Sequence, residues 1–281
     1  MPATLTRPLD QAKPDQAKPN QAKLTAAQVA SFHRDGFIIV RGLISLPEIQ
    51  ALVAAFEDIV ALGTTPGLFE PRPGADPLDQ FPRIMHPHRR TELAAGRLAR
   101  QYLLDERVMD ILAQLIGEEH IAAQSMYYFK PPGGRGQCLH QDDTYLATNP
   151  GVCQAAWLAL DHVDPDNGGL FVVPGTQNCP LLPTKAADLS LSFSTDESVL
   201  PAGSAAPVPV VMAPGDMLFF NGRLVHGSSP NASPSRFRRS YICHYVPAST
   251  ATMSEWYRPQ IRRDGSELIL PAPGAGVGGR E

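Results

Sequence analysis

Residues 137–145 read QCLHQDDTY, and this polar stretch lies between two apolar stretches, 121–129 and 153–160, that have the length of β-strands. From position 121 onward the chain consists of such short stretches, separated by Gly, Pro, Asn and Asp residues. The same pattern predicts further strands at 169–173, 208–212, 216–221 and 240–246. Many short strands with turn residues between them are typical of a sandwich or barrel rather than of alternating βαβ units. The sequence therefore predicts a mainly β core.

The chain upstream of this core carries helical signals. Thr25 and Ser45 each open a capping box, because Gln or Glu follows three positions later. Gly36 and Gly63 are placed to end the two helices, and helical spacing of apolar residues returns over 91–117. We therefore expect a helical N-terminal third that packs against the β core, without a second domain.

The first 23 residues differ from the rest of the chain. Residues 10–23 repeat the pattern DQAKP with a period of five and without a bulky apolar side chain. Such a segment cannot offset the entropy of ordering by burial, so we expect a disordered low-complexity tail over 1–23. A single domain is expected over 24–250, followed by a C-terminal extension over 251–281.

The composition argues against several classes of protein. Of the 281 residues, 43% are hydrophobic, which is enough to bury a core, and no apolar run approaches the ~18 residues of a membrane helix. The formal net charge of −4 argues against a nucleic-acid partner, which favours a strongly basic face. Four cysteines without CxxC spacing, and an N-terminus without an apolar signal segment, predict a reduced, cytoplasmic protein. We expect a small molecule as partner, no membrane contact, and a monomer or homodimer.

The residues His140-Gln141-Asp142 are the sharpest chemical signal in the chain. On an extended segment, positions i and i+2 project to one face, so the imidazole and the carboxylate would point to one place. His226 is a candidate for a second imidazole, and two His with one carboxylate leave open positions on the metal, as in non-haem Fe(II) oxygenases. The other six histidines are expected at the surface or in hydrogen-bonded core positions: His33, His86, His88, His120, His162 and His244.

Zinc is the alternative metal. Cys138 lies two positions before His140, and Cys243 is adjacent to His244. Structural zinc sites usually contain closely spaced cysteine pairs, which this sequence lacks. Iron is therefore the preferred assignment.

The order of further motifs resembles the phytanoyl-CoA dioxygenase family, whose members are non-haem Fe(II)/2-oxoglutarate oxygenases and include ectoine hydroxylase. The resemblance extends from about residue 24 to about residue 247. The motifs that carry it are FHRDGF at 32–37, KPP at 130–132, HQD at 140–142, WLALD at 157–161, NGGL at 167–170, VPGT at 173–176, PGD at 214–216, HGS at 226–228 and FRR at 237–239. This ordered set is far more specific than the HxD pattern alone.

The resemblance implies a double-stranded β-helix core, that is a jelly-roll or cupin-like fold, flanked by helices, with Fe(II), 2-oxoglutarate and O2 as cofactors. It implies that His140, Asp142 and His226 are the metal ligands and the catalytic centre. It implies 2-oxoglutarate contacts for Arg238, Ser228, Trp157, Lys130 and Met126, with the neighbouring Arg239 as the alternative arginine. It also implies that Gln124 contacts the substrate. A guanidinium group can bind a carboxylate through two parallel hydrogen bonds, which suits the arginine's role.

The expected reaction is hydroxylation of an aliphatic C–H bond, with release of succinate and CO2. Related halogenases have a small residue in place of the carboxylate, whereas Asp142 is present here. The substrate is expected to be a small molecule, amino-acid-like or a natural-product intermediate, rather than an acyl-CoA. Thr144 and Tyr145 follow the metal motif and are further candidates for substrate contact, while loops at 63–90 and 178–206 are candidate lids.

Two other functional classes stay open. The first is a non-redox cupin-like metal enzyme, an isomerase or lyase, that uses the same three ligands without 2-oxoglutarate. The second is a catalytically silent β-barrel binding module. Three arginines of the first loop, Arg83, Arg89 and Arg90, fit either an acidic substrate group or a solvated basic patch. Succinate release separates the oxygenase from both alternatives.

Overall fold

The computed structural model describes residues 23–74 and 76–274, so the expected tail, apart from its last residue, lies outside the described residues. The helices are α1 (Ala26–Asp35), α2 (Leu46–Leu62), α3 (Pro77–Gln80), α4 (Ala94–Leu103), α5 (Glu106–Ile116) and α6 (Asp143–Leu146), with 3-10 turns η1 (Pro87–Arg89), η2 (Thr176–Asn178) and η3 (Glu255–Tyr257). The strands are β1 (Phe37–Val40), β2 (Ile84–Met85), β3 (His120–Tyr128), β4 (Gln137–His140), β5 (Gln154–Ala159), β6 (Leu170–Val172), β7 (Thr184–Ala186), β8 (Asp196–Ser198), β9 (Val208–Pro209), β10 (Met217–Asn221), β11 (His226–Ser228), β12 (Ser240–Pro247), β13 (Gln260–Ile261) and β14 (Glu267–Leu268).

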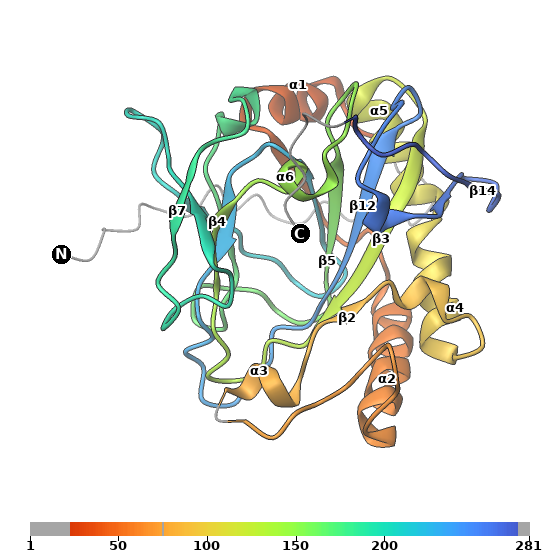
Figure 1. Cartoon of the computed structure of the whole chain (residues 1–281), viewed down its shortest axis with the longest axis vertical. Coiled ribbons are helices and arrows are strands. Elements are labelled where there is room, and N and C mark those ends of the chain that lie inside the picture. Colours follow the sequence, from red (N-terminus) through yellow and green to blue (C-terminus); the bar gives the residue numbers. More distant parts are fainter. Residues whose placement is uncertain (1–22, 75, 275–281) are drawn as a thin grey trace.

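Two antiparallel sheets form the core. The larger has the strand order β1-β10-β5-β12-β3-β13-β14, with β2 also paired to β3, and the smaller has the order β4-β11-β6-β9. In Figure 1, β5, β12 and β3 of the larger sheet lie opposite β4, and α6 lies between them near one end. Apolar side chains of both sheets, among them Trp157, Ile242 and Val172, form one buried cluster. The predicted jelly-roll core flanked by helices is confirmed, although the described strands form two sheets rather than one closed barrel.

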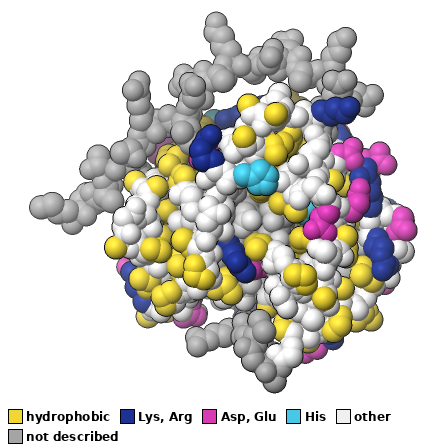
Figure 2. Space-filling view, turned by 90° about the horizontal axis from the view of Figure 1, so that it is seen from above, with side chains coloured by type: hydrophobic (Ala, Val, Ile, Leu, Met, Phe, Trp, Pro, Cys, Tyr) yellow, Lys and Arg dark blue, Asp and Glu magenta, His cyan; other side chains and the backbone are white. Residues whose placement is uncertain are grey.

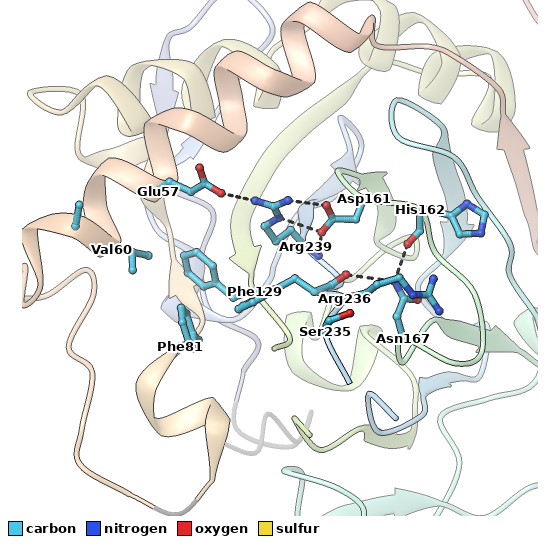
Figure 3. Close-up of a pocket in the computed structure, with 12 residues that line it drawn as sticks. Glu57, Val60, Phe81, Phe129, Asp161, His162, Asn167, Ser235, Arg236 and Arg239 are labelled. Atoms are coloured by element: carbon cyan, nitrogen blue, oxygen red, sulfur yellow. Dashed lines mark hydrogen bonds and ion pairs between the residues drawn. The ribbon is translucent and has the colours of Figure 1, made fainter. Parts of the chain in front are cut away.

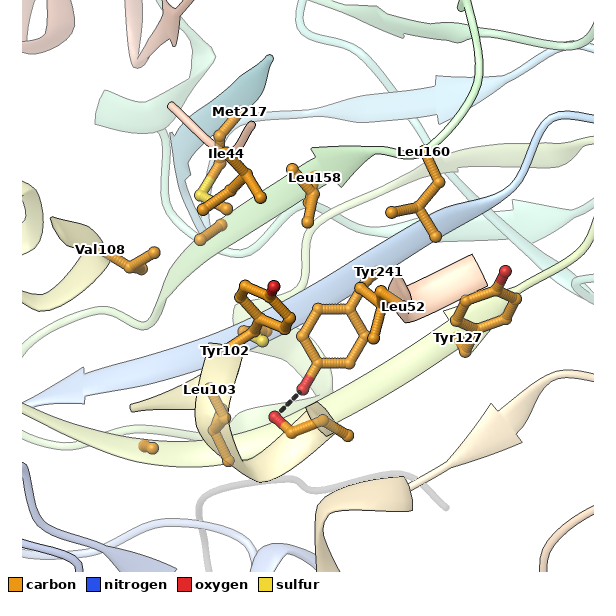
Figure 4. Close-up of a cluster of buried hydrophobic side chains, with 14 of the residues drawn as sticks. Ile44, Leu52, Tyr102, Leu103, Val108, Tyr127, Leu158, Leu160, Met217 and Tyr241 are labelled. Atoms are coloured by element: carbon orange, nitrogen blue, oxygen red, sulfur yellow. Dashed lines mark hydrogen bonds between the residues drawn. The ribbon is translucent and has the colours of Figure 1, made fainter. Parts of the chain in front are cut away.

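The N-terminal helices cover the outer face of the larger sheet (Figure 1). Leu52 and Phe56 of α2 belong to a buried cluster that also contains Tyr127 and Tyr241 of the sheet (Figure 4). Phe56 stacks on Tyr127 with 3.9 Å between the ring centroids, and the hydroxyl of Tyr241 donates to the carbonyl of Ala99 in α4 at 2.5 Å. Burial of a large apolar side chain contributes roughly 1.5–3 kcal/mol. This packing therefore holds the sheet that carries much of the site.

The predicted helix ends are confirmed. Thr25 and Ser45 form the capping boxes of α1 and α2, and Gly36 and Gly63 are the residues at which these helices end. Gly36 takes a φ of 87°, in the left-handed region that glycine enters without steric cost. The helical spacing over 91–117 corresponds to α4 and α5.

Each predicted strand has a counterpart, in β3, β5, β6, β9, β10 and β12. The expectation that His140 and Asp142 share one extended segment is wrong. β4 ends at His140, and Asp142 already has helical dihedral angles, φ −61° and ψ −32°, directly before α6. A strand-to-helix turn, rather than strand alternation, therefore places the two side chains.

The expected loops contain regular structure. Residues 63–90, which we expected to be a structureless loop, contain α3, β2 and η1. β2 pairs with β3, where Ile84 lies opposite Tyr127. Residues 178–206 contain the β7–β8 hairpin. Part of the expected C-terminal extension joins the larger sheet, since Ile261 of β13 pairs with Ala122 of β3.

The surface agrees with the balanced composition. On the face shown in Figure 2, acidic and basic side chains lie next to one another along one edge, and hydrophobic side chains are spread over the rest. The described residues of this face form no continuous basic stripe of the kind that binds nucleic acid. Within the described ranges, no helix combines the length and the apolar character that a membrane span requires.

Candidate active site

Two strands of the smaller sheet bring two imidazoles together. His140 of β4 lies opposite His226 of β11, and their ring centroids are 4.1 Å apart. Oδ1 of Asp142 lies 3.5 Å from Nε2 of His140 and 3.7 Å from Nε2 of His226. All three side chains are buried, and one ligand atom of each lies within 4.8 Å of the others. Two imidazoles and one carboxylate are the donor set of a non-haem iron site, so these residues fit a single metal ion.

Backbone carbonyl groups orient both imidazoles. Nδ1 of His140 lies 2.9 Å from the carbonyl oxygen of Cys138, and Nδ1 of His226 lies 3.0 Å from that of Leu224. Because a carbonyl only accepts, each Nδ1 carries the proton and each Nε2 keeps its lone pair. Burial, together with the neighbouring His140, lowers the pKa of His226 to about 4. His226 is therefore neutral at pH 7, the form that binds a metal.

A third histidine holds the carboxylate. Nε2 of His244 lies 3.0 Å from Oδ2 of Asp142, while Oδ1 is the oxygen near His140 and His226. Burial alone would raise the pKa of Asp142, but the neighbouring histidines, with His226 first, hold it well below its usual range. The carboxylate is therefore ionised and has one oxygen directed toward the two metal-facing nitrogens.

This contact was not predicted from the sequence. His244 is a hydrogen-bonded core residue, as predicted, but its partner is Asp142. One signal was present: positions 238, 240, 242 and 244 alternate onto one face of an extended segment, so a site at Arg238 predicts neighbours at Ser240 and His244.

Two buried basic side chains, Arg238 and Lys130, share one hydrogen-bond acceptor, and burial first, then the charge of Arg238, lower the pKa of Lys130 well below its usual range. Arg238 is 4% exposed and Lys130 is 3% exposed. Arg238 donates from Nη1 to the hydroxyl of Ser240 at 2.8 Å and from Nε to the carbonyl of Gly168 at 3.3 Å. Nζ of Lys130 donates to the same carbonyl at 2.9 Å. Neither has a carboxylate partner among the described residues. A buried guanidinium without a counter-charge is costly, so the pocket at Arg238 fits an anionic ligand.

The remaining residues expected around 2-oxoglutarate lie in the same place. The hydroxyl of Ser228, two positions after His226, accepts from Nζ of Lys130 at 2.9 Å. The Trp157 ring lies 5.4 Å from the guanidinium carbon of Arg238, and Met126 belongs to the same buried cluster as Trp157. Burial lowers the pKa of Arg238 to about 10, so the guanidinium stays charged at pH 7.

Arg239 points elsewhere. It donates to both carboxylate oxygens of Asp161, at 2.7 and 3.0 Å, and to Glu57 at 2.5 Å (Figure 3). These groups line a cavity of about 640 Å³ beside α2, together with Phe81 and Phe129 (Figure 3). None of the three clustered metal-ligand candidates lines this cavity, so its size says nothing about the space beside them.

The expected substrate residues lie around the same cluster. Gln124 of β3 is buried and pairs with His244 of β12. The Tyr145 ring lies 6.3 Å from that of His140 and is 38% exposed, and Thr144 precedes it in α6 and is half-buried.

The arginines of the first loop differ in their partners. Arg83 donates to the hydroxyl of Tyr128 at 3.1 Å and lies over the ring of Phe193, whose centroid is 4.8 Å away. It thus joins the 63–90 and 178–206 segments, and it has no carboxylate partner in the described part of the chain. Arg90 pairs with Glu92 at 2.5 Å, whereas Arg89 lines a separate cavity of about 260 Å³.

Two expectations about histidine and cysteine are settled by these contacts. His86 was expected at the surface or hydrogen-bonded in the core, and this is wrong, because it is buried and neither ring nitrogen has a hydrogen-bond partner in the part of the chain that the structure describes. The thiol of Cys138 donates to the carbonyl of Asp196 at 3.0 Å, and Cys243 belongs to the outer hydrophobic cluster. The described metal-ligand group contains neither cysteine, which does not support zinc.

Comparison with known proteins identifies the family of this chain. The sequence model of the family described as "Phytanoyl-CoA dioxygenase (PhyH)" matches residues 32–240, about three quarters of the chain. The chain belongs to this family. As a family member it is an Fe(II)- and 2-oxoglutarate-dependent dioxygenase with O2 as the second cosubstrate, as the sequence predicted. The matched residues include the metal-ligand candidates and Arg238.

Individual relatives of this dioxygenase are distant. The peroxisomal phytanoyl-CoA dioxygenase of Bos taurus is 28% identical over 239 residues, covering 80% of this chain and 69% of the relative. A methylphosphonate hydroxylase of Gimesia maris is 28% identical over 242 residues, covering 85% and 87%. Two solved structures share the fold, each with a TM-score of 0.66. The carbocyclase SnoK is 21% identical and covers 92% of this chain and 97% of its own. The epimerase SnoN, in complex with Fe3+ and alpha ketoglutarate, is 19% identical and covers 91% and 92%.

Proposed function

We propose that this dioxygenase hydroxylates an aliphatic C–H bond of a small acidic molecule, releasing succinate and CO2. One observation carries the proposal: His140, Asp142 and His226 form a buried metal-ligand group, and the buried Arg238 has no carboxylate partner among the described residues. The triad suits Fe(II), and the arginine suits the distal carboxylate of 2-oxoglutarate.

The residues have separate tasks in this scheme. His140, Asp142 and His226 would hold iron on one face, which leaves the opposite positions for 2-oxoglutarate and O2. Arg238 would bind the distal carboxylate through its guanidinium fork, with Lys130 and Ser228 as further donors and Trp157 and Met126 as the packing wall. When bound, iron and 2-oxoglutarate supply the oxidising chemistry, and the protein supplies orientation and exclusion of water.

The candidate substrate residues would define the reacting position. Gln124 pairs with His244 in the sheet, and Thr144 and Tyr145 follow Asp142 in α6, so these side chains would set which carbon faces the iron. A displacement of about 1 Å at this position can cost about 100-fold in rate.

An acidic substrate group is supported by Arg83. Its guanidinium lies beside Tyr128 and Phe193 without a carboxylate partner among the described residues. The hydroxylase relative from Gimesia maris acts, by its name, on methylphosphonate, a small acid, and it matches over 87% of its own length. We therefore infer an amino-acid-like or other small acidic substrate rather than an acyl-CoA. A cytoplasmic location and a monomeric or homodimeric state stay predictions.

Succinate release tests the proposal. The full chain is incubated with Fe(II), 2-oxoglutarate and O2, with a panel of small carboxylates and phosphonates that includes methylphosphonate. We expect one panel member to raise succinate formation and to gain the mass of one oxygen atom.

His140→Ala should abolish both signals, and Arg83→Met should raise the KM for an acidic substrate with little change in kcat. A metal enzyme of isomerase type would isomerise its substrate without succinate, and a silent binding module would give neither product.

A further inference from the structure

The imidazole of His86 is buried and makes no hydrogen bond among the described residues. The residue is 8% exposed, and neither Nδ1 nor Nε2 has a hydrogen-bond partner in the described structure. His88, two positions later, is buried as well, but its Nδ1 lies 2.6 Å from the hydroxyl of Ser125. A buried polar group that lacks a partner costs free energy, so an unsatisfied imidazole calls for a function or a missing ligand.

The backbone at this residue is unusual too. His86 has φ 50° and ψ 41°, in the left-handed region that residues other than glycine adopt uncommonly, with Asn, Asp and His entering it more often than the rest. Its amide nitrogen donates to the carbonyl of Ser125 at 2.8 Å, which holds it between β2 and η1 at the side of β3. Residues held in such conformations cluster at ligand sites.

The surroundings of His86 are aromatic and close to the candidate active site. Its ring centroid lies 6.0 Å from that of Trp256 and 6.2 Å from that of Tyr257. Both belong to η3, so the C-terminal segment covers this side of the site. Burial first, then the positive charges of Arg89 and of protonated His244, lower the pKa of His86 to about 3. Tyr257 belongs to the buried cluster that also contains Leu146 of α6, the helix that starts directly after Asp142, so His86 and the triad lie on the same side of the larger sheet.

A neutral imidazole offers one donor and one acceptor. An uncharged hydroxyl or amide group can pair with either nitrogen, as acceptor from the protonated one or as donor to the other, whereas an acidic group would find no cation in this ring. The flanking indole and phenol rings favour a flat or cyclic skeleton next to that group.

We propose that His86 is a specificity residue of the substrate site, and that it hydrogen-bonds an uncharged hydroxyl or amide group on a cyclic part of the substrate, packed against Trp256 and Tyr257. This inference rests on the proposed function, since it takes the space beside the triad as the substrate site. It adds the uncharged polar group to the acidic group inferred from Arg83.

The test compares two small probes that differ by one hydroxyl, p-cresol and toluene. Their dissociation constants are measured by NMR on the full chain loaded with Fe(II) and 2-oxoglutarate, without O2. We expect the wild-type protein to bind p-cresol about 10-fold or more tightly than toluene, because one satisfied hydrogen bond separates them. His86→Leu should reduce this ratio to about one. His86→Asn should keep part of it, because Asn tolerates the left-handed backbone and retains a donor and an acceptor.

His88→Asn is the matched control. It changes a buried histidine of the same loop whose partner is already Ser125, so the p-cresol to toluene ratio should stay at the wild-type value. The affinity for 2-oxoglutarate, measured on each variant, shows that the site is folded. An equal ratio in the wild-type protein and in His86→Leu overturns the inference, as does a wild-type protein without preference for p-cresol. If the preference behaves as expected but succinate never forms, the proposed function fails and the role of His86 in binding stands.

Discussion

The imidazole of His244 and the carboxylate of Asp142 are 3.0 Å apart, although 102 positions separate them in the chain. The contact holds Oδ2, so that Oδ1 stays directed toward His140 and His226. Partners that orient metal ligands in this way typically change metal affinity by about 10–100-fold when removed. We therefore predict that His244→Phe lowers the affinity for Fe(II) by about this factor while the triad remains in place, measured by calorimetric titration without O2.

A more conservative variant separates orientation from packing. His244→Gln retains a side-chain donor and should recover part of the Fe(II) affinity that His244→Phe loses. His120→Gln is the control, because His120 is buried but its Nδ1 contacts the carbonyl of Glu118 instead of the triad. Wild-type Fe(II) affinity in His244→Phe would show that the contact is only structural.

The two adjacent arginines should behave differently. Arg238→Gln removes the buried cation without a carboxylate partner, so we predict a loss of 2-oxoglutarate affinity of about 100-fold or more, the size of effect seen when one partner of a buried charge pair is truncated. Arg239→Gln breaks the contacts to Asp161 and Glu57, which should lower thermal stability but leave 2-oxoglutarate affinity near the wild-type value. Calorimetric titration of the Fe(II)-loaded protein checks both. A larger binding defect in Arg239→Gln would reverse the assignment.

Gly168 offers a test of the same pocket through the backbone. A Cβ at this position would lie 2.8 Å from Cε of Lys130 and 2.8 Å from the carbonyl oxygen of Ser229, at a φ of 76°. Gly168→Ala should therefore displace Lys130 and weaken 2-oxoglutarate binding by about 10-fold, since hydrogen bonds to charged groups contribute ~1.5–3 kcal/mol.

Gly203→Ala is the matched control. Gly203 has a φ of 81°, and a Cβ there meets nothing within 4 Å. Both variants carry the strain of the left-handed region, roughly 1–2 kcal/mol, but only Gly168→Ala disturbs the pocket. Equal 2-oxoglutarate affinities in the two variants would rule out Gly168 and Lys130 as parts of the binding site.

Local sequence signals predicted much of this fold. The capping boxes at Thr25 and Ser45 and the apolar stretches of β3, β5, β10 and β12 depend on neighbours within a few positions, which the sequence displays directly. β4 reads QCLH and β11 reads HGS, so neither contains the apolar run that marks the other strands, and the strands of His140 and His226 were found only in the structure.

Long-range geometry accounts for what the sequence could not predict. His244 reaches Asp142 because β12 runs between β3 and β5 and because α6 starts directly after Asp142. Which of Arg238 and Arg239 is free to bind 2-oxoglutarate depends on which one turns toward Asp161. Arg239 does so, across 78 positions of the chain. The isolation of His86 likewise depends on η3, which packs against it from the far end of the chain. Such contacts are set by tertiary packing, which no local pattern encodes.

Buried histidines should make the protein less stable in mild acid. Burial lowers the pKa of His88 to about 3 and that of His120 to about 4, against 6.5 for an exposed histidine. Between these values the unfolded chain binds protons that the folded chain does not, so the free energy of unfolding decreases as the pH falls from 6.5 toward 4. Each such histidine contributes a slope of ~1.4 kcal/mol per pH unit. Urea denaturation of the metal-free protein between about pH 6 and pH 5 measures the slope.

His88→Gln should reduce that slope by ~1.4 kcal/mol per pH unit, because glutamine does not titrate in either state. Its loss of the contact with Ser125 lowers stability equally at every pH, and so it changes the intercept and not the slope. His120→Gln gives a second, independent measurement with the same expected reduction. An unchanged slope in both variants would mean that these imidazoles accept protons in the folded protein, and hence that their surroundings open to water in mild acid.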